Sequence, residues 1–169
     1  MAEILKGAPV AAALTENLIS QTEKLKAQGI IPTLAILRVG ENPGDISYET
    51  GAMKRCEKIG IEVKNFRLPE NSSREKILDS IHEINNDKFI HGCLMLRPLP
   101  DKNVEKEACE ILSPSKDVDC MTKGSLAKVF SGFGEGYAPC TAEACIELMK
   151  HYGIEISGKK VAVIGRSLV

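Results

Sequence analysis

Residue types that could bind a small molecule stand in the segments between the apolar runs of this chain. Tyr48 follows one such run, and its ring could either stack on a flat ligand or cover the edge of a core. Asp117 and Asp119 stand one residue apart in a loop, where aspartates form turns more often than they bind ligands. Residues 165–167 read Gly-Arg-Ser after another apolar run, and arginine is well suited to phosphate recognition. Each group alone is a weak signal, so its meaning depends on the elements that position it.

The run that organises the prediction is Cys93–Leu96. It begins after Gly92 and is stopped by Arg97, Pro98 and Pro100. A short uncharged run of this kind is typical of a strand buried on both faces of a parallel sheet. Because proline cannot continue a central ladder, the chain must leave the sheet at Pro98. Ligands of open α/β sheets bind where the strands end, so this turn is an expected part of a site.

Predicted helices and strands alternate along the rest of the chain. The helices are predicted from Pro9 to Gly29, from Asp45 to Ile59, from Ser72 through Ile84, over about 103–112, over Ser125–Phe130 and over Thr141–Tyr152. The strands are predicted over Thr33–Val39, Ile61–Leu68, 92–97 and Lys159–Ile164. This order predicts an α/β fold, a three-layer domain with a mostly parallel sheet, in which the less apolar second strand lies nearer an edge. The last strand and its Gly-Arg-Ser turn predict the start of a second, nucleotide-binding Rossmann domain.

Polar residues at three helix starts are expected to accept hydrogen bonds from the first backbone N–H groups. Asp45 and Thr141 have side chains suited to capping. Ser72 and Glu75 have the spacing of a capping box. If the helix after the first strand begins at Asp45, then Tyr48 lies in its first turn.

Composition excludes several classes of protein. The chain has 169 residues, of which 43% are hydrophobic and 27% charged, which fits one globular domain or one domain and part of another. The net charge of −1 offers no electrostatic case for nucleic acid or a membrane surface. No apolar run approaches the ~20 residues that span a bilayer, and the N-terminus lacks a signal-peptide pattern. We therefore expect a cytoplasmic protein with neither nucleic acid nor membrane as a partner.

The six cysteines and three histidines do not indicate a metal site. There is no C-x-x-C pair, and the histidines lack the spacing of ligands. Cys93 lies in a predicted core strand, and Cys56 and Cys145 lie in predicted helices. Reduced thiols that pack as small apolar residues are the expected state.

Taken together, the motifs resemble the methylenetetrahydrofolate dehydrogenase/cyclohydrolase family over nearly the whole chain. The matching segments are Tyr48 with Gly60-Ile61, His91-Gly92, Pro98-Leu99-Pro100, Lys116–Asp119, Pro139–Thr141 and Val163–Ser167. In that family a catalytic domain and a Rossmann domain enclose a cleft, where folate lies against the nicotinamide of NADP or NAD. The resemblance implies oxidation of methylene- to methenyl-tetrahydrofolate, followed by hydration to formyl-tetrahydrofolate, in one-carbon metabolism and purine biosynthesis.

The resemblance also implies roles for individual residues. Tyr48 matches the tyrosine that packs against folate, and Asp119 matches the aspartate that hydrogen-bonds the pterin, so these two are the expected catalytic residues. Leu96, Pro98 and Leu99 match positions that line the substrate pocket.

The cofactor side and the domain division follow from the same resemblance. Gly165, Arg166 and Ser167 match residues that receive NADP or NAD. The expected divisions are residues 1–140 as the folate-binding catalytic domain, 141–153 as an inter-domain helix and 154–169 as the start of the Rossmann domain. The resemblance further implies a homodimer for the full-length protein. We interpret the chain as a fragment of such a protein and expect it to be inactive by itself.

Three positions depart from the family pattern. Ala52 stands where the family has a lysine one helical turn after the tyrosine, and Leu96 stands where it has a glutamine. That lysine and glutamine are associated with the cyclohydrolase step. Asp45 replaces a frequent serine. Lys54 lies about 200° round the helix from Ala52 and is expected to face elsewhere.

Two functions are therefore open at this point. One is a folate-dependent oxidoreductase with weakened or lost cyclohydrolase activity. The alternative is a non-catalytic folate-binding relative or an inactive fragment. The retained Tyr48, Asp119, Arg166 and Ser167 favour the enzyme.

Overall fold

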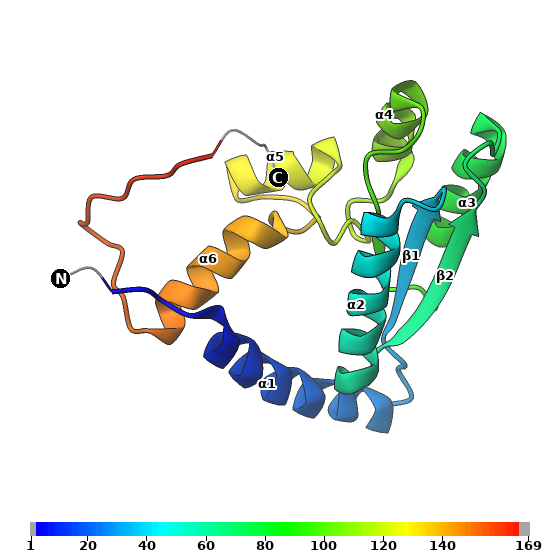
Figure 1. Cartoon of the computed structure of the whole chain (residues 1–169). Coiled ribbons are helices and arrows are strands. Elements are labelled where there is room, and N and C mark those ends of the chain that lie inside the picture. The colour runs from blue at the N-terminus through cyan, green and yellow to red at the C-terminus, as the bar shows by residue number, and fades with distance from the viewer. Residues whose placement is uncertain (1–2, 166–169) are drawn as a thin grey trace.

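A computed structural model of the chain describes residues 3–165 and forms a sheet with helices on both faces (Figure 1). The elements in order are α1 (Gly7–Ala27), β1 (Thr33–Val39), α2 (Pro43–Ile59), β2 (Glu62–Leu68), α3 (Arg74–Asn86), β3 (Gly92–Met95), α4 (Lys102–Ile111), α5 (Lys123–Ser131) and α6 (Cys140–His151). Within the described residues, no helix is both long and apolar enough to cross a membrane.

The sheet is parallel and has the order β2-β1-β3. β1 is the central strand, and its last five residues are buried. β2 is an edge strand, as predicted, and its exposed and half-buried residues mostly alternate. β3 is shorter than predicted, because it ends at Met95 rather than at residue 97. The predicted parallel α/β sheet is confirmed.

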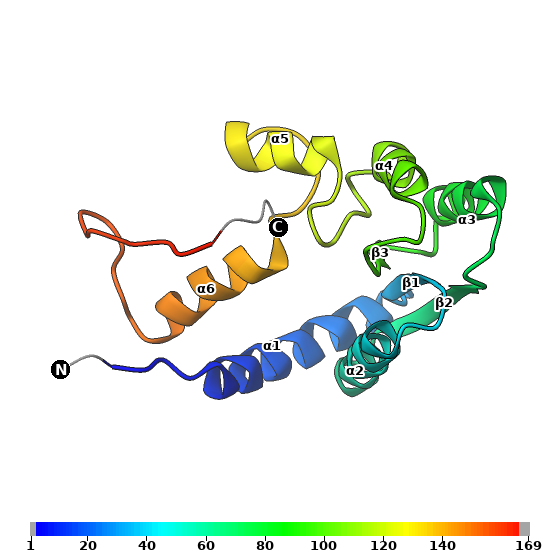
Figure 2. The same cartoon turned by 45° about the horizontal axis from the view of Figure 1, so that its top comes forward.

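Two layers of helices enclose this sheet (Figure 2). α3 and α4 cover one face, whereas α2 and part of α1 cover the other. The main core lies on the α3 side, where Ile77, Ile81 and Ile84 form the buried face predicted for that helix. β1 and β3 supply the facing side chains of this core, among them Leu37 and Met95. The three-layer prediction is therefore confirmed.

The start of α2 differs from the prediction. The helix begins at Pro43, whose fixed φ suits the first helical position, and Asn42 is the N-cap. The Asn42 Oδ1 atom accepts a hydrogen bond from the Gly44 N–H at 2.8 Å. Asp45 is thus not the cap but a first-turn residue, and Tyr48 lies in the second turn.

The starts of α3 and α6 also differ from the predicted caps. Ser73, rather than Ser72, caps α3, and its Oγ accepts from the Lys76 N–H at 3.2 Å. α6 begins after Pro139 without a side-chain cap, so the prediction for Thr141 is wrong. At the start of α3, two adjacent serines of equal capping ability compete, and local sequence does not decide between them.

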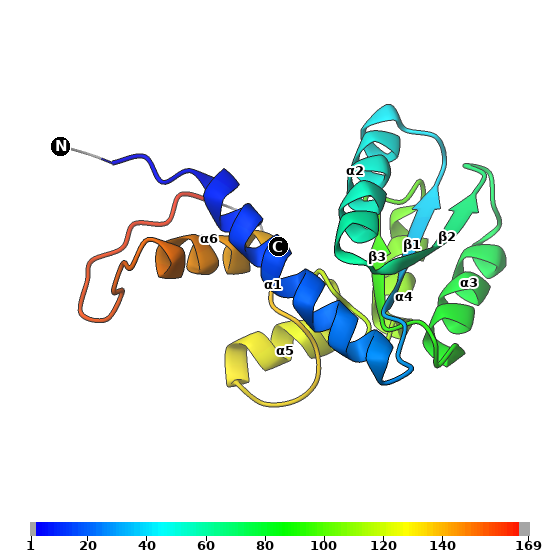
Figure 3. The same cartoon turned by 90° about the horizontal axis from the view of Figure 1, so that it is seen from below.

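α5, α6 and the segment after them extend away from the sheet (Figures 1 and 3). α6 lies beside the N-terminal half of α1, and the Tyr152 hydroxyl donates to the Lys6 carbonyl at 2.9 Å. The predicted strand Lys159–Ile164 does not form, and Val161, Val163 and Ile164 are exposed. A strand needs a neighbouring strand to satisfy its backbone groups, and the described residues offer none to this segment.

Candidate functional site

Tyr48 and Asp119 meet at a hollow of about 310 Å³ beyond the carboxyl end of β3. α2 contributes Gly44, Asp45 and Tyr48 to its wall, and residues 94–97 form the floor. We call this space the Asp119 hollow. It lies where the strand-end rule places a ligand. Two residues predicted for the site, 71 positions apart in the chain, are thus brought together.

A second, larger hollow of about 700 Å³ is lined by the same tyrosine. It shares Gly44, Tyr48 and Leu94 with the Asp119 hollow, and its further wall includes Ala52 and Val118. We call it the Ala52 hollow. Most of these side chains are apolar, and Tyr48, which lines both hollows, is 63% exposed. An exposed aromatic ring beside a hollow can stack on a flat ligand.

The Leu96 side chain lines the Asp119 hollow and is only 7% exposed. Pro98 is exposed, whereas Leu99 is buried in the main core, and neither is among the residues lining the two hollows. Glu105 on α4 holds this turn: its Oε1 accepts from Arg97 Nη2 and its Oε2 from the Leu99 N–H, both at 2.7 Å. Pro98 and Leu99 therefore shape the site through the backbone turn rather than as lining side chains.

The two aspartates of the Lys116–Asp119 loop have different surroundings. Asp117 is fully buried, and its carboxylate accepts from the N–H groups of Met121 at 2.9 Å and Thr122 at 2.7 Å. Burial alone would raise the pKa of Asp117, but these backbone hydrogen bonds, together with the hydroxyls of Ser125 and Thr122, outweigh it and hold the pKa below its usual value. Asp119 is half-buried and faces the hollow. The turn-forming role thus falls to Asp117, which leaves Asp119 available to a ligand.

Lys116 fixes the other end of the same loop. Its Nζ donates to the carbonyls of Ile84, Asn85 and Asp87 at 2.6–3.0 Å, and so completes the C-terminus of α3. Burial lowers the pKa of Lys116. Lys116 ties the loop to the end of α3, and Asp117 ties it to the backbone of Met121 and Thr122. The loop is therefore held on both sides of Asp119.

Close packing beneath the loop explains Gly92. A Cβ atom at this position would lie 2.6 Å from Val118 Cγ1, so only glycine permits the approach of β3 to the loop. The Cys93 N–H donates to the Lys116 carbonyl at 2.6 Å, which continues the sheet toward the loop.

The basic residues near Tyr48 in sequence lie away from it in space. Lys54 lines a separate hollow on the opposite side of α2, as predicted. Arg55 donates through Nη1 to the Thr15 hydroxyl of α1 at 2.9 Å. Ala52 does share the Tyr48 side, because four residues make about one helical turn.

Sequence reasoning gave no site role to Cys140, which lines the Ala52 hollow. Its thiol donates to the Val118 carbonyl at 3.2 Å. Burial, followed by the contact with Asp119, raises the pKa of Cys140 to about 11. Among residues 3–165, no cluster of His, Cys, Asp or Glu has the arrangement of a metal site.

The residues expected to receive a dinucleotide are not assembled in the described structure. Gly165 is exposed, and a Cβ atom placed there would contact nothing. Arg166 and Ser167 lie outside the described residues. Residues 3–165 therefore offer no assembled cradle for NADP or NAD.

A three-layer α/β domain with a hollow at its strand ends has the architecture in which open α/β sheets commonly bind small molecules. Two family models identify it further. Residues 5–119 match the catalytic domain of tetrahydrofolate dehydrogenase/cyclohydrolase, and residues 139–169 match the NAD(P)-binding domain. The chain belongs to the tetrahydrofolate dehydrogenase/cyclohydrolase family, which confirms the resemblance drawn from the motifs.

Individual relatives agree with this assignment. The bifunctional protein FolD of Carboxydothermus hydrogenoformans is 45% identical over 169 residues, which is all of this chain and 59% of the relative. That of Alkaliphilus metalliredigens is 41% identical, covering all of this chain and 60% of the relative. The chain thus spans about three fifths of the length of these curated relatives.

Solved structures show the same fold. The bifunctional FolD methylenetetrahydrofolate dehydrogenase/cyclohydrolase of Campylobacter jejuni aligns with a TM-score of 0.89 at 32% identity, covering 98% of this chain and 58% of that one. The Trypanosoma brucei enzyme, complexed with NADP cofactor and an inhibitor, aligns with a TM-score of 0.84 at 25% identity, covering 94% and 54%.

Proposed function

We propose that this chain is the folate-binding part of a methylenetetrahydrofolate dehydrogenase. The observation that carries the proposal is the meeting of Tyr48 and Asp119 at one hollow, in a chain of this family. We also propose the division into 1–140 for folate binding, 141–153 as an inter-domain helix and 154–169 as the start of the NAD(P)-binding domain. A homodimer and a cytoplasmic location stay predictions.

The chain's own contribution to the reaction is positioning. The Asp119 carboxylate can accept hydrogen bonds from the N–H groups of a pterin, while the Tyr48 ring stacks on the flat part of the folate. When bound, NADP or NAD supplies the hydride acceptor. Holding two reactants in the right geometry is worth up to ~7–11 kcal/mol of the barrier in favourable cases. The dehydrogenase step needs no proton donor or acceptor from the lining of the hollows.

Hydration of the methenyl product does need proton transfers, and the lining offers few groups for them. Ala52 is half-buried on the Tyr48 side of α2, and Leu96 lines the floor of the Asp119 hollow. Neither titrates. Arg97 is engaged by Glu105, and a guanidinium keeps its proton near neutral pH. We therefore propose a cyclohydrolase activity that is low or absent.

The two substitutions are consistent with each other physically. A glutamine at position 96 without the lysine at position 52 would leave buried polar atoms unpaired, at about 1–3 kcal/mol. Apolar groups at both positions avoid that penalty. The proposed loss is thus a paired change that keeps the fold stable.

The test uses the extended protein, by which we mean this chain continued through a complete NAD(P)-binding domain as in its relatives. Methenyl-tetrahydrofolate absorbance is followed after addition of methylene-tetrahydrofolate and NADP, and in parallel NAD. We expect the methenyl species to accumulate without enzyme-dependent decay. Hydrolysis as fast as the dehydrogenase would contradict the proposal, and Asp45→Asn would then test the remaining carboxylate of the Asp119 hollow.

Restoring the family's lysine and glutamine at positions 52 and 96 gives a second test of the same proposal. The double variant Ala52→Lys with Leu96→Gln should raise cyclohydrolase activity by roughly 10²-fold, because a positioned general acid or base contributes ~10²–10⁴-fold. Ala52→Met with Leu96→Gln adds similar bulk without a titratable group and should stay low. If the unaltered extended protein binds folate but does not oxidise it, the alternative function as a non-catalytic folate-binding relative is supported instead.

A further inference from the structure

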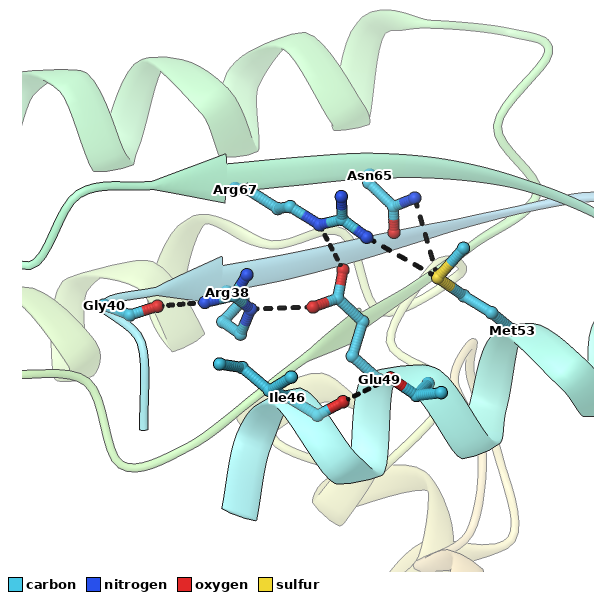
Figure 4. A network of polar contacts seen from close by, with 8 residues as sticks. Arg38, Gly40, Ile46, Glu49, Met53, Asn65 and Arg67 are labelled. Carbon is cyan, nitrogen blue, oxygen red and sulfur yellow. Dashed lines mark hydrogen bonds and ion pairs between the residues drawn. The ribbon is translucent and has the colours of Figure 1, made fainter. Parts of the chain in front are cut away.

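A charged network lies beneath the N-terminal half of α2 (Figure 4). Glu49 Oε2 accepts from Arg38 Nε of β1, and Glu49 Oε1 accepts from Arg67 Nε of β2, both at 2.7 Å. Arg38 also donates through Nη1 to the Gly40 carbonyl, at the start of the loop that leads into α2. One carboxylate therefore joins the helix to two strands, and one of its partners also holds the entering loop.

This network is the main anchor of that half of the helix. Among residues 43–55 of α2, Glu49 is the one buried residue, at 2% exposure, whereas Cys56 and Ile59 are the buried residues of the second half. Apolar packing therefore holds the far end of α2. The end that carries Tyr48 is held by ion pairs.

The two arginines need the carboxylate between them. Arg38 and Arg67 are paired in register on neighbouring strands, and like charges directly opposite each other are destabilising. The two arginines hold the pKa of Glu49 below its usual value, although burial alone would raise it. Nearby, Met53 Sδ receives only weak contacts, from Arg67 Nη2 at 3.7 Å and Asn65 Nδ2 at 3.8 Å. The ionised carboxylate of Glu49 is therefore the main polar partner of both guanidinium groups on this side of the sheet.

We propose that Glu49 is a positioning residue, which through Arg38 and Arg67 sets the rotation of α2 and so directs Tyr48 into the folate site. Successive residues of an α-helix project roughly 100° apart, so fixing Glu49 against the sheet fixes Tyr48 toward the two hollows. The inference rests on the proposed function in that Tyr48 is taken to contact folate. It adds a role for a residue that touches neither hollow.

The kinetic test compares Glu49→Gln with the unaltered extended protein. The amide keeps the size of the side chain but cannot bind both guanidinium groups as a charged acceptor. We expect kcat/KM for methylene-tetrahydrofolate to fall roughly 10- to 100-fold, since small misplacements can cost 10²-fold, with the KM for NADP unchanged. Arg67→Gln, which keeps the Arg38 contact, should act in the same direction but less, and it carries the test if Glu49→Gln does not fold.

Two controls separate positioning from stability. Glu83→Gln makes the same chemical change in an exposed ion pair with Lys64 and should leave folate kinetics unchanged. Ile84→Val, in the core on the other face of the sheet, should lower thermal stability without changing the KM for folate. If Glu49→Gln lowers only stability, as Ile84→Val does, the inference is overturned.

A spectroscopic readout is independent of catalysis. In this chain labelled with fluorotyrosine, Glu49→Gln should shift or broaden the Tyr48 resonance, assigned with Tyr48→Phe, and leave those of Tyr137 and Tyr152 in place. An unchanged Tyr48 resonance overturns the inference whether or not the extended protein is active. If the unaltered extended protein is inactive but Glu49→Gln still shifts the Tyr48 resonance, only the proposed function is overturned.

Discussion

Replacement of Asp117 by asparagine should destabilise the chain strongly, although Asp117 lines neither hollow. Its carboxylate is fully buried and accepts from the N–H groups of Met121 and Thr122 at 2.9 and 2.7 Å. Asparagine keeps one oxygen acceptor. Its NH₂ group would then face a backbone N–H, donor against donor, with no water to take over.

The expected size of the effect follows from these contacts. One buried N–H left without an acceptor costs about 1–3 kcal/mol. The hydrogen bond that remains would have a neutral instead of a charged acceptor. This change costs about 1 kcal/mol more, because hydrogen bonds to charged groups contribute ~1.5–3 rather than ~0.5–1.5 kcal/mol. We therefore expect Asp117→Asn to lower the free energy of unfolding by about 2–4 kcal/mol at pH 7.

The pH dependence has a defined sign. Hydrogen bonds lower the folded-state pKa of Asp117 against the opposing effect of burial. The stability it contributes is therefore present above the ordinary aspartate pKa and is lost as the pH falls through the lower folded-state value. The difference in stability between the unaltered chain and Asp117→Asn should shrink in that acid window.

Urea unfolding of this chain measures the effect, and Asp119→Asn is the matched control two residues away. Asp119 is half-buried at the hollow, so its variant should lose less than about 1 kcal/mol, as substitutions away from buried networks usually do. In the extended protein the same control should lose folate binding. Equal destabilisation by the two variants, or a loss below ~1 kcal/mol for Asp117→Asn, would refute the division of roles within the loop.

Three further outcomes follow from single observations. Gly92→Ala should destabilise the chain by about 1–3 kcal/mol in urea unfolding, because its Cβ would lie 2.6 Å from Val118 Cγ1; a neutral variant would show that the loop yields easily. The Cys140 thiol, with its pKa raised to about 11, should react slowly with iodoacetamide at pH 7 and faster only as the pH approaches that value; rapid alkylation at pH 7 would contradict this. Backbone amides of residues 154–165 should exchange with deuterium far faster than those of β1, and comparable protection would mean that a partner strand forms in solution.

The sheet was predictable because each buried strand is a short apolar run with a clear stop. The order of the strands within the sheet was less predictable. Cys93–Leu96 has the sequence of a central strand, yet the structure places β1 between β2 and β3. Both strands are apolar runs, and local sequence does not state how many neighbours a strand has. That information lies in contacts between distant segments.

Residues lining the hollow were predictable where several motifs together matched one family, although each residue type alone was a weak signal. Tyr48 lies on the helix after β1, Asp119 lies in the loop that bridges to β3, and both line one hollow. Leu99 stands in the same turn as Pro98 but packs into the core, because an apolar side chain beside a hollow can equally turn inward. Glu49 was missed, since a glutamate on a helix ordinarily faces water. Its partners lie 11 and 18 residues away, and the available signal was an arginine, Arg38, inside an otherwise apolar strand.

The segment after α6 shows the same limit most clearly. Residues 159–164 read KKVAVI, which resembles the TLAILRV of β1 in its apolar and β-branched content. β1 forms a strand because β2 and β3 take up its backbone N–H and C=O groups on both sides. The later segment has equal propensity but no neighbour among the described residues, and Val163 and Ile164 remain exposed. Strand formation needs partners, which residues 159–164 lack within the described structure, whereas the positions of Tyr48 and Asp119 are fixed by their own helix and loop.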